Sequence, residues 1–556
     1  MVVGAKMTIQ HVPSKGRISI MKIQNFTVHK RHSVIKAVYG ALLAVLALAS
    51  VFIDPVQIFT NWYVQLAEGK FVFEMWQRPT YELRSEVYVF NYTNVREYLA
   101  GEHAVMKLQE IGPFKFLEHR TNDNLTVDSA LGVMRMRPNT DLEFLPEESV
   151  AHYRDVQLTV PNIALIAIST FIADKLGYFA NAGAYYSISA LGSTLFKNLT
   201  AEELIWGYYD PIVSIANKLL PGWIDFEKIG ILDRFYAKRP ETAEVEIGDA
   251  SRRFSINLWN DSPGILEQGF TDLNTSVPCN RIKGSYEGLM FPPMMSKDTV
   301  FPIYRRQACR IYPFSFAEEV NGEQGFKYYR YELQESAFSK SSEYACPCSH
   351  NCLPEGFVDV SNCYYGFPIT LSKPHFVGAD PAQQKYFEGM KPEIMTENSQ
   401  FFLEPTIGVP LSLSINVQIN IAVRMSSGNP ITKPVKDKIL PIMRLSVYCN
   451  EAPKEVINLL WLRLVIAPPL VLAIQVALFL LGTLVTAQGA YRIWKPQYKL
   501  IEQKEKTPAR RKSAERRRSS IVLNMSDNCA FKDDDDLAKE AVSLLAITEE
   551  DGDFPI

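Results

Sequence analysis

The sequence predicts an α+β membrane protein in which a large, mostly antiparallel sheet or barrel lies between two transmembrane helices near the ends of the chain. Three observations predict this fold class. Two long apolar segments begin at Val34 and Leu464. Between them, strand-like alternation of apolar and polar residues recurs without regular helical insertions. The same intervening segment contains clustered cysteines and glycosylation sequons, which are typical of an extracellular or lumenal space.

The two apolar segments, 34–53 and 464–486, are each long enough to cross a bilayer. A hydrocarbon core about 30 Å thick needs roughly 20 apolar helical residues. Pro468 and Pro469 are expected to kink or loosen the lumenal end of the second helix. The alternatives are buried core helices and, for the first segment, a signal peptide. The residues that follow Ile53 offer a poor signal-peptide cleavage site.

Basic residues near the spans predict that both termini are cytoplasmic. Residues 1–33 contain six lysines and arginines and no acidic residue, and a basic run follows the second span. We therefore expect cytoplasmic tails over 1–33 and 487–556. The segment 54–457 is then an extracellular or lumenal ectodomain.

Strand-like alternation, broken by Gly, Pro and Asn, recurs along the ectodomain. Examples are SEVYVFNYTN at 85–94, RRFSINLWND at 252–261, GFKYYRYEL at 325–333 and LSLSINVQINIAVRM at 411–425. This pattern favours a mostly antiparallel sheet or barrel. The overall composition is 47% hydrophobic and 21% charged with a net charge of −3, which excludes a disordered chain and gives no basic excess for nucleic acid.

An apolar stretch from Val160 to Phe196 interrupts the strand pattern. A third transmembrane span is not expected there, because Asp174 and Lys175 lie in its middle and glycines interrupt it. An odd number of spans would also place the two tails on opposite sides of the membrane. We expect two or three short helices with an apolar surface, which is typical of a binding site or a membrane-facing patch.

Sequons and cysteines support placement of this segment outside the cytoplasm. Asn-x-Ser/Thr sequons predict glycosylation at Asn91, Asn124, Asn198, Asn260 and Asn274. The sequons at Asn25 and Asn524 lie in the predicted cytoplasmic tails, and we expect them to stay unmodified. Six of the eight cysteines are close together: Cys279, Cys309, Cys346, Cys348, Cys352 and Cys363.

An even cluster of cysteines in an extracellular segment predicts three disulfides, but their connectivity does not follow from the count. The alternative is a zinc site in CPCSHNC, where His350 lies among three thiols. Oxidising conditions and the cramped spacing disfavour it. Cys449 is left unpaired just outside the second span, and Cys529 is expected to be cytoplasmic and reduced.

The sequence shows no catalytic machinery. It contains no GxSxG elbow, HExxH motif, Walker A loop or Rossmann glycine pattern. The ectodomain histidines are scattered and more typical of structural roles: His103, His119, His152, His350 and His375. His152 as a pH sensor is an alternative. We expect a protein that is not an enzyme and that uses no metal and no cofactor.

The C-terminal tail is polar and expected to be mostly disordered. Its basic run at 504–520 predicts attachment to anionic lipid heads, which phosphorylation of Ser513, Ser519 or Ser520 would weaken. The alternative is a solvated charge run that acts only as a stop-transfer signal.

Two short motifs in this tail predict recognition by adaptor proteins. Tyr498 and Ile501 fit a tyrosine-based sorting signal. Glu540, Leu544 and Leu545 fit an acidic dileucine signal. They favour endosomal or lysosomal routing as the alternative to the plasma membrane.

Several motifs in a fixed order resemble the class B scavenger receptors. This family includes lysosomal integral membrane proteins and insect sensory neuron membrane proteins, and the chain is similar to an insect-like member. The motifs are VYVFNYTN at 87–94, LQEIGPFKF at 108–116, ELIWGYYDP at 203–211, CNRIKGSYEGLMFPP at 279–293, CRIYPFSF at 309–316, CLPEGFVDVSNC at 352–363, SKPHFVGADP at 372–381 and EPTIGVPL at 404–411. The resemblance extends almost from span to span.

The resemblance implies an antiparallel β-barrel capped by a helical bundle farthest from the membrane, which we expect at about 150–200. It also implies a lipid-sized tunnel toward the bilayer. The disulfides it implies are Cys279–Cys346, Cys309–Cys363 and Cys348–Cys352.

The chain departs from the family pattern at three places. Phe114 replaces a tyrosine, 396–403 lacks a histidine found in some relatives, and no lysine matches the one that takes part in fatty-acid binding in others. Lys175 and Lys197 are nearby but unaligned. The ligand-binding residues are therefore left open.

The expected function is that of a scavenger-type receptor. It would bind lipid, lipoprotein or apoptotic debris at the apical bundle and pass lipid through the tunnel to the membrane. Burial of a lipid chain of about 16 CH₂ groups, at roughly 0.8 kcal/mol each, would suffice without fixed polar contacts. The alternative is a lysosomal trafficking or adhesion receptor for a protein cargo.

Overall fold

The computed structural model describes residues 16–494 except 65, 220, 239, 270–276, 347, 349–351, 396 and 424–429. The chain divides into two compact units, Val38–Thr486 and Met1–Ala37 with Ala487–Ile556. All of the predicted ectodomain lies in the first of these units.

In the described part of the chain, two helices are long and apolar enough to cross a membrane. They are Arg31–Ile53, within α1 (Gly16–Ile53), and Lys454–Trp494. The second is longer than the predicted span and consists of α10 (Lys454–Trp461), a π-helical turn η10 (Leu462–Ile466) and α11 (Ala467–Trp494). From Val38 onward, the apolar side chains of both helices are largely exposed, as expected for residues that face hydrocarbon.

The π-helical turn η10 has a cause in the sequence. Pro468 and Pro469 have no N–H group to donate to the carbonyls four residues earlier. The N–H of Ala467 instead donates to the Leu462 carbonyl, five residues earlier. The local departure that the two prolines predict is thus a widened helical turn directly before them.

The two spans approach each other through small residues. A Cβ atom built on Gly40 would lie 2.6 Å from the Thr486 backbone nitrogen, and one on Gly482 would lie 2.6 Å from the Ala44 backbone nitrogen. Only glycine permits such close backbone approach, which is the usual basis of helix packing in membranes.

Most of the ectodomain is one large antiparallel sheet. Along its path the strand order is β10-β11-β12-β16-β17-β18-β1-β2-β3-β8-β9. The strands are β1 (Leu83–Tyr92), β2 (Met106–Asp128), β3 (Val133–Phe144), β8 (Ala243–Glu246), β9 (Ile256–Trp259), β10 (Phe301–Arg305), β11 (Arg310–Asn321), β12 (Lys327–Leu333), β16 (Gln400–Glu404), β17 (Val409–Ala422) and β18 (Ile439–Cys449).

The segment 284–286 joins the two edge strands of this sheet. Tyr286 bridges Ser255, beside β9, and Ile303 in β10. The Ile256 N–H donates to the Ser285 carbonyl at 2.7 Å, and the Tyr286 N–H donates to the Pro302 carbonyl at 2.8 Å. Because both edges are paired through one segment, the sheet closes into a barrel.

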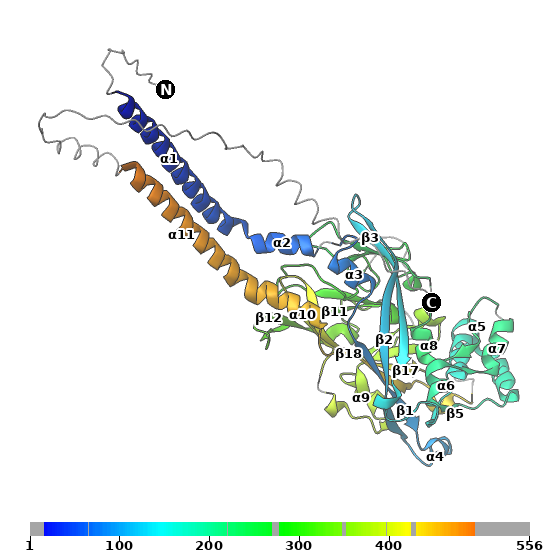
Figure 1. Cartoon of the computed structure of the whole chain (residues 1–556). Helices are drawn as coiled ribbons and strands as arrows, with labels where there is room; N and C mark the ends of the chain where they lie inside the picture. Colours follow the sequence, from blue (N-terminus) through cyan, green and yellow to red (C-terminus); the bar gives the residue numbers. More distant parts are fainter. Residues whose placement is uncertain are drawn as a thin grey trace, which may run out of the picture. The chain divides into compact units, whose positions relative to one another are not determined.

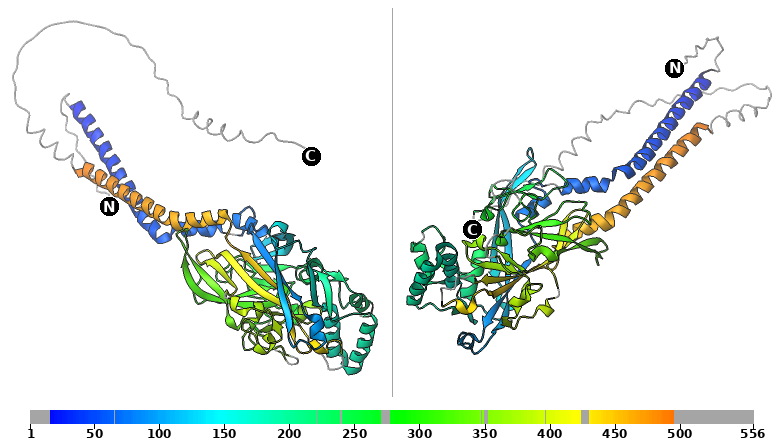
Figure 2. Two further views of the ribbon diagram at one scale, coloured as in Figure 1. Left: turned by 90° about the horizontal axis from the view of Figure 1, so that it is seen from below. Right: turned by 180° about the vertical axis from the view of Figure 1, so that it is seen from behind.

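Several of the other elements lie at the two ends of the barrel (Figures 1 and 2). One end carries α5 (Ile163–Ala190), α6 (Ala201–Trp206), α7 (Pro211–Leu219) and the hairpin of β4 (Gln157–Pro161) and β5 (Phe196–Thr200). The other end carries α2 (Pro55–Tyr63), α3 (Phe71–Gln77) and α10. The predicted α+β fold, with a barrel-like antiparallel sheet and an apical helical group, is confirmed.

The prediction of two or three short helices over 160–196 is wrong. One helix of 28 residues, α5, occupies most of this stretch between β4 and β5. An internal glycine costs a helix about 1 kcal/mol relative to alanine, which is too little to break it where tertiary contacts support it. The N-terminal turns of α5 supply those contacts, because Leu165 and Ile166 are fully buried.

Candidate functional site

The interior of the barrel contains a cavity of about 130 Å³. Its wall is mainly apolar and comes from strands on several sides, with Phe314 from β11, Leu333 from β12, Ile415 from β17 and Leu445 from β18. Strand alternation places every second residue of a barrel strand inside, so apolar inward residues create this lining. We call this space the main cavity.

Two smaller cavities adjoin the main cavity and share wall residues with it. One, of about 30 Å³, shares Arg120, Gly288 and Leu413 and extends to Tyr81 and Cys449. We call it the membrane-side cavity. The other, of about 20 Å³, shares Phe235 and Gln307 with the main cavity and reaches the Cys309–Cys363 disulfide. The three spaces therefore form a row through the barrel.

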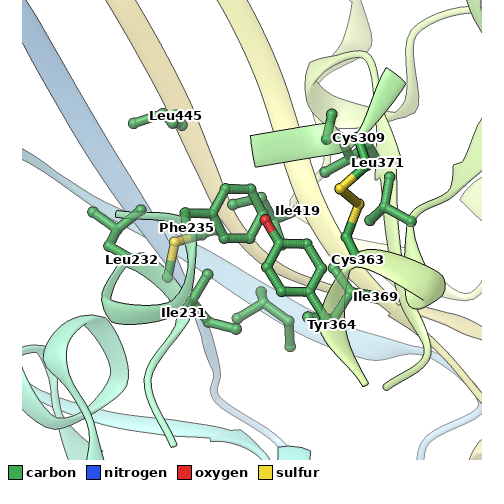
Figure 3. Close-up of a cluster of buried hydrophobic side chains, with 14 of the residues drawn as sticks. Ile231, Leu232, Phe235, Cys309, Cys363, Tyr364, Ile369, Leu371, Ile419 and Leu445 are labelled. Carbon is green, nitrogen blue, oxygen red and sulfur yellow. A yellow bond between two sulfur atoms is a disulfide. The ribbon is translucent and has the colours of Figure 1, made fainter. Parts of the chain in front are cut away.

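An aromatic pair separates the main cavity from the smallest one. Figure 3 shows the rings of Phe235, from α8 (Ile231–Phe235), and Tyr364 facing each other beside the Cys309–Cys363 disulfide. Their centroids lie 4.9 Å apart at an interplanar angle of 19°. The Tyr364 hydroxyl donates to the Gln307 carbonyl, so the pair is held in place at this partition.

The membrane-side cavity ends beside the second span. The Tyr81 hydroxyl donates to the Pro410 carbonyl at 2.9 Å, and both residues line the cavity. Burial raises the pKa of Tyr81, with a smaller contribution from the nearby Cys449. Tyr81 also packs against a separate apolar cluster that includes Val456 and Leu460 of α10. The row of cavities thus leads to the base of the apolar helix α10–α11.

Charged residues interrupt the apolar wall of the main cavity. Glu118 is buried, and its Oε1 accepts hydrogen bonds from the Ser85 hydroxyl at 2.6 Å and the Tyr236 hydroxyl at 2.9 Å. Its Oε2 accepts from Arg120 Nη2 at 3.0 Å and Nε at 3.3 Å. Glu118 and Arg120 are therefore a closed ion pair with every carboxylate oxygen bonded.

Glu287 and Arg305 line the same cavity without such pairing. Arg305 Nη1 donates to the Glu287 backbone carbonyl at 3.4 Å. The guanidinium groups of Arg120 and Arg305 lower the pKa of the Glu287 carboxyl, but burial raises it by more, so the net shift is upward. Burial and the neighbouring Arg120 lower the pKa of Arg305 to about 10, so Arg305 is still cationic at neutral pH.

The sequence singled out none of these four charged residues. Arg120 follows closely on one quoted motif, LQEIGPFKF, and Glu287 lies inside another, CNRIKGSYEGLMFPP. For Glu118, Arg120 and Arg305, the available signal was a charged residue at an inward-facing strand position, which requires knowledge of the strand register. Glu287 lies outside the strands.

Comparison with known proteins gives the family. The model of the CD36 family matches residues 38–493. The chain belongs to the CD36 family. It is 27% identical over 457 residues to scavenger receptor class B member 1 of Sus scrofa, covering 80% of this chain and 86% of that protein. It is 28% identical over 428 residues to lysosome membrane protein 2 of Homo sapiens, covering 74% of this chain and 85% of that protein.

The structure of this CD36-family chain contains the disulfides that the resemblance implies. Cys279 is bonded to Cys346 with a Cα–Cα distance of 5.2 Å, Cys309 to Cys363 at 6.0 Å, and Cys348 to Cys352 at 5.8 Å. The three cysteines of the alternative zinc site are therefore disulfide-bonded and offer no thiolate to a metal ion. His350 lies outside the described residues. Cys449 is a free, buried cysteine.

Four predicted glycosylation sites lie in the described part of the chain. Asn124 and Asn198 are exposed, whereas Asn91 and Asn260 are half-buried. The side chains of Asn91, Asn198 and Asn260 accept hydrogen bonds through Oδ1, while a glycan attaches to Nδ2. Asn274 lies outside the described residues.

The apical helices present apolar side chains to solvent. Phe179 and Tyr186 of α5 are 89% and 72% exposed, and Tyr209, in the neighbouring short strand β6 (Tyr208–Tyr209), is 66% exposed. Lys197, one of the two nearby lysines, pairs with the buried Asp210 and lies 4.9 Å from the Tyr208 ring. The charge of Lys197 is therefore already balanced by the Asp210 carboxylate. The side chain of Lys175 lies outside the described residues.

The four ectodomain histidines in the described part of the chain make different contacts. His152 packs edge-on against Phe144, and His119 pairs with the exposed Glu143 at 2.7 Å. His103 lies 3.0 Å from the Asn94 amide, and His375 is buried. The predicted sorting residues Tyr498, Ile501, Glu540, Leu544 and Leu545 lie outside the described residues.

Proposed function

We propose that this CD36-family chain is a scavenger-type receptor that binds lipid inside the barrel and passes it toward the membrane. The observation that carries the proposal is the row of adjoining cavities that ends beside α10, in which the main and membrane-side cavities have largely apolar walls. Burial of each CH₂ group of a lipid tail contributes roughly 0.8 kcal/mol, so apolar walls can retain a chain without many polar contacts.

The proposed topology places both termini in the cytoplasm and the barrel in the extracellular or lumenal space. The basic residues that flank both spans support it. The main location is proposed to be the plasma membrane, with endosomes or lysosomes as the alternative. Lipids, lipoproteins or apoptotic debris are the proposed ligands.

Photolabelling tests lipid binding directly. Full-length protein in phosphatidylcholine nanodiscs would be labelled with a fatty acid carrying a diazirine on its tail, and the adducts mapped by mass spectrometry. We expect saturable adducts on cavity-lining peptides of β17 and β18. Unlabelled lipid should displace them, and labelling that is uniform over the surface or does not saturate would contradict the proposal.

A matched pair of variants on one strand sharpens this test. Leu413 lines both the main and the membrane-side cavities, so Leu413→Trp should fill the passage and abolish saturable labelling. Ser414 is the next residue on β17 and lines neither cavity. Ser414→Trp should therefore label like the wild type.

The exposed apolar side chains of the apical helices support a second candidate function. Exposed aromatic residues grouped on one surface are typical of a protein-binding site. A trafficking or adhesion receptor would use Phe179 and Tyr186 to hold a protein cargo. A lumenal protein that co-purifies with the wild type and is lost with the double variant Phe179→Ser, Tyr186→Ser would favour it.

A further inference from the structure

The short helix α2 begins where the first span ends. α1 ends at Ile53, and Asp54 turns the chain with a left-handed φ of 44°. The Asp54 carboxylate accepts a hydrogen bond from the Gln57 N–H at 3.1 Å, and Pro55 takes the first helical position. A new helix therefore starts in a different direction from α1 (Figure 1).

One face of α2 is an exposed apolar stripe. Its members recur with the spacing of a single helical face, and they are Pro55, Ile58, Phe59 and Trp62. Ile58 is 55% exposed, Phe59 61% and Trp62 53%. A surface helix of a water-soluble protein turns its apolar stripe toward the core. In α2 this stripe points outward.

The polar face of α2 is turned toward the second span instead. Arg463 Nη2 donates to Gln57 Oε1 at 2.8 Å, and Arg463 Nε donates to the Thr60 hydroxyl. Thr60 is buried. These hydrogen bonds fix the rotation of α2 about its axis, so the apolar stripe is held away from the protein.

Two independent features place α2 at the level where the spans leave hydrocarbon. It follows directly on Ile53, the last residue of the first span, and it is bonded to Arg463, which directly precedes the predicted second span. An arginine is costly in the bilayer core, whereas arginine, lysine and tryptophan side chains are common at the interface. Lys70 Nζ lies 3.3 Å from the centroid of the Trp62 ring, which places an ammonium group beside the stripe.

We propose that α2 is an interfacial helix whose apolar stripe inserts into the headgroup region of the leaflet on the barrel side. Helices of this kind bury their apolar face about 5–10 Å into the boundary between headgroups and acyl chains. The stripe continues the exposed apolar surface of the first span, where Phe52 is 85% exposed, so the same lipids cover both. This surface lies outside both spans, and its assignment does not rest on lipid binding inside the barrel.

The consequence is a fixed seat for the base of the barrel. The chain joins α2 to the first span, and Arg463 joins it to the second. Insertion of the stripe would therefore hold the ends of both spans and the adjoining part of the barrel at one depth.

A fluorescent probe on the stripe tests the proposal. Full-length protein with Cys529→Ser and Phe59→Cys would be labelled with a nitrobenzoxadiazole reagent in phosphatidylcholine nanodiscs. Cys449 is 2% exposed, and the parent Cys529→Ser protein measures any labelling at that residue. We expect a blue-shifted emission that is quenched by lipids carrying a nitroxide near the top of the acyl chain and is shielded from iodide in the buffer.

The matched control lies on the same helix. Asn61 is also exposed but lies on the face opposite the stripe, so a probe on Asn61→Cys should be open to iodide and weakly quenched by the nitroxide lipids. Ile58→Cys provides a second stripe position and should behave like Phe59→Cys. All three substitutions replace exposed side chains, and an unfolding midpoint equal to that of the parent protein reports that each variant is folded.

Two results would overturn the proposal. One is equal nitroxide quenching at the stripe positions and at Asn61, with all probes open to iodide, which would leave the stripe in water. The other is a stripe probe shielded from both quenchers, which would place a protein surface on the stripe, such as that of a second copy of the chain. Neither result bears on photolabelling of the cavities, so the proposed function is tested separately.

Discussion

The hydroxyl of Tyr81 donates a hydrogen bond to the carbonyl oxygen of Pro410 across the membrane-side cavity, at 2.9 Å. The two residues are far apart in sequence, yet together they border the last space before α10. Tyr81→Ala should widen this end of the row and raise the rate at which a fluorescent fatty acid leaves the barrel for nanodisc lipid. Stopped-flow transfer measures that rate.

Tyr81→Phe is the matched control for this variant. It removes the hydrogen bond but keeps the ring, so its transfer rate should lie close to that of the wild type. Equal rates in wild type and Tyr81→Ala would show that lipid does not leave past this residue.

The spans should tolerate no side chain at Gly40. A Cβ there would meet the Thr486 backbone nitrogen at 2.6 Å, and a backbone atom cannot rotate away as a side chain can. Overpacking typically costs about 1–3 kcal/mol. Gly40→Leu should lower the thermal unfolding midpoint of detergent-purified protein, whereas Val45→Leu, at a position that is 62% exposed, should leave it unchanged.

The disulfides should differ in their contributions to stability. Cys309 and Cys363 are 54 residues apart in sequence, whereas Cys348 and Cys352 are 4 apart. A longer closed loop restricts the unfolded chain more, which predicts about 4 kcal/mol for the first bond and about 2 kcal/mol for the second. Denaturant unfolding of each paired Cys→Ser variant tests this order, and equal losses would contradict it.

Cys449 should react slowly with alkylating reagents. It is 2% exposed, and its thiol donates to the Glu451 carbonyl at 3.2 Å. Burial raises its pKa above the ordinary value of 9.0, and only the thiolate reacts, so the rate should keep rising above pH 9. Iodoacetamide labelling in a Cys529→Ser background measures this, with denatured protein as the fast reference.

The dileucine motif predicts a cellular phenotype. Replacement of Leu544 and Leu545 by alanine should move the protein from endosomes or lysosomes to the cell surface, because the adaptor-binding side chains are lost. Surface biotinylation measures the shift. Tyr498→Ala in the same tail is the comparison. An unchanged distribution in both variants would show that neither motif acts as a sorting signal.

Local sequence signals predicted the parts of the fold that depend on neighbouring residues. The spans follow from apolar length and the strands from alternation. The stretch 160–196 was misjudged because its glycines suggested breaks, whereas burial of residues such as Leu165 supports one continuous helix. The disulfide pairing came from family resemblance and not from spacing.

The charged wall of the main cavity could not be predicted in the same way. Glu118 and Arg305 are far apart in the sequence and line the same cavity only because the barrel closes. Alternation shows which residues of a strand share a face. It does not show which inward residues border empty space, since that depends on strand register and on the closing segment.

The segment 284–286, which joins β9 to β10, continues directly into Glu287 and Gly288. The segment that closes the barrel and the wall of the main cavity are thus continuous in the chain. Any loosening of this segment would change the width of the barrel and the position of Glu287 in the cavity wall together. In such a conduit, mechanical integrity and chemical discrimination are a single property, and a substitution that weakens one should weaken the other.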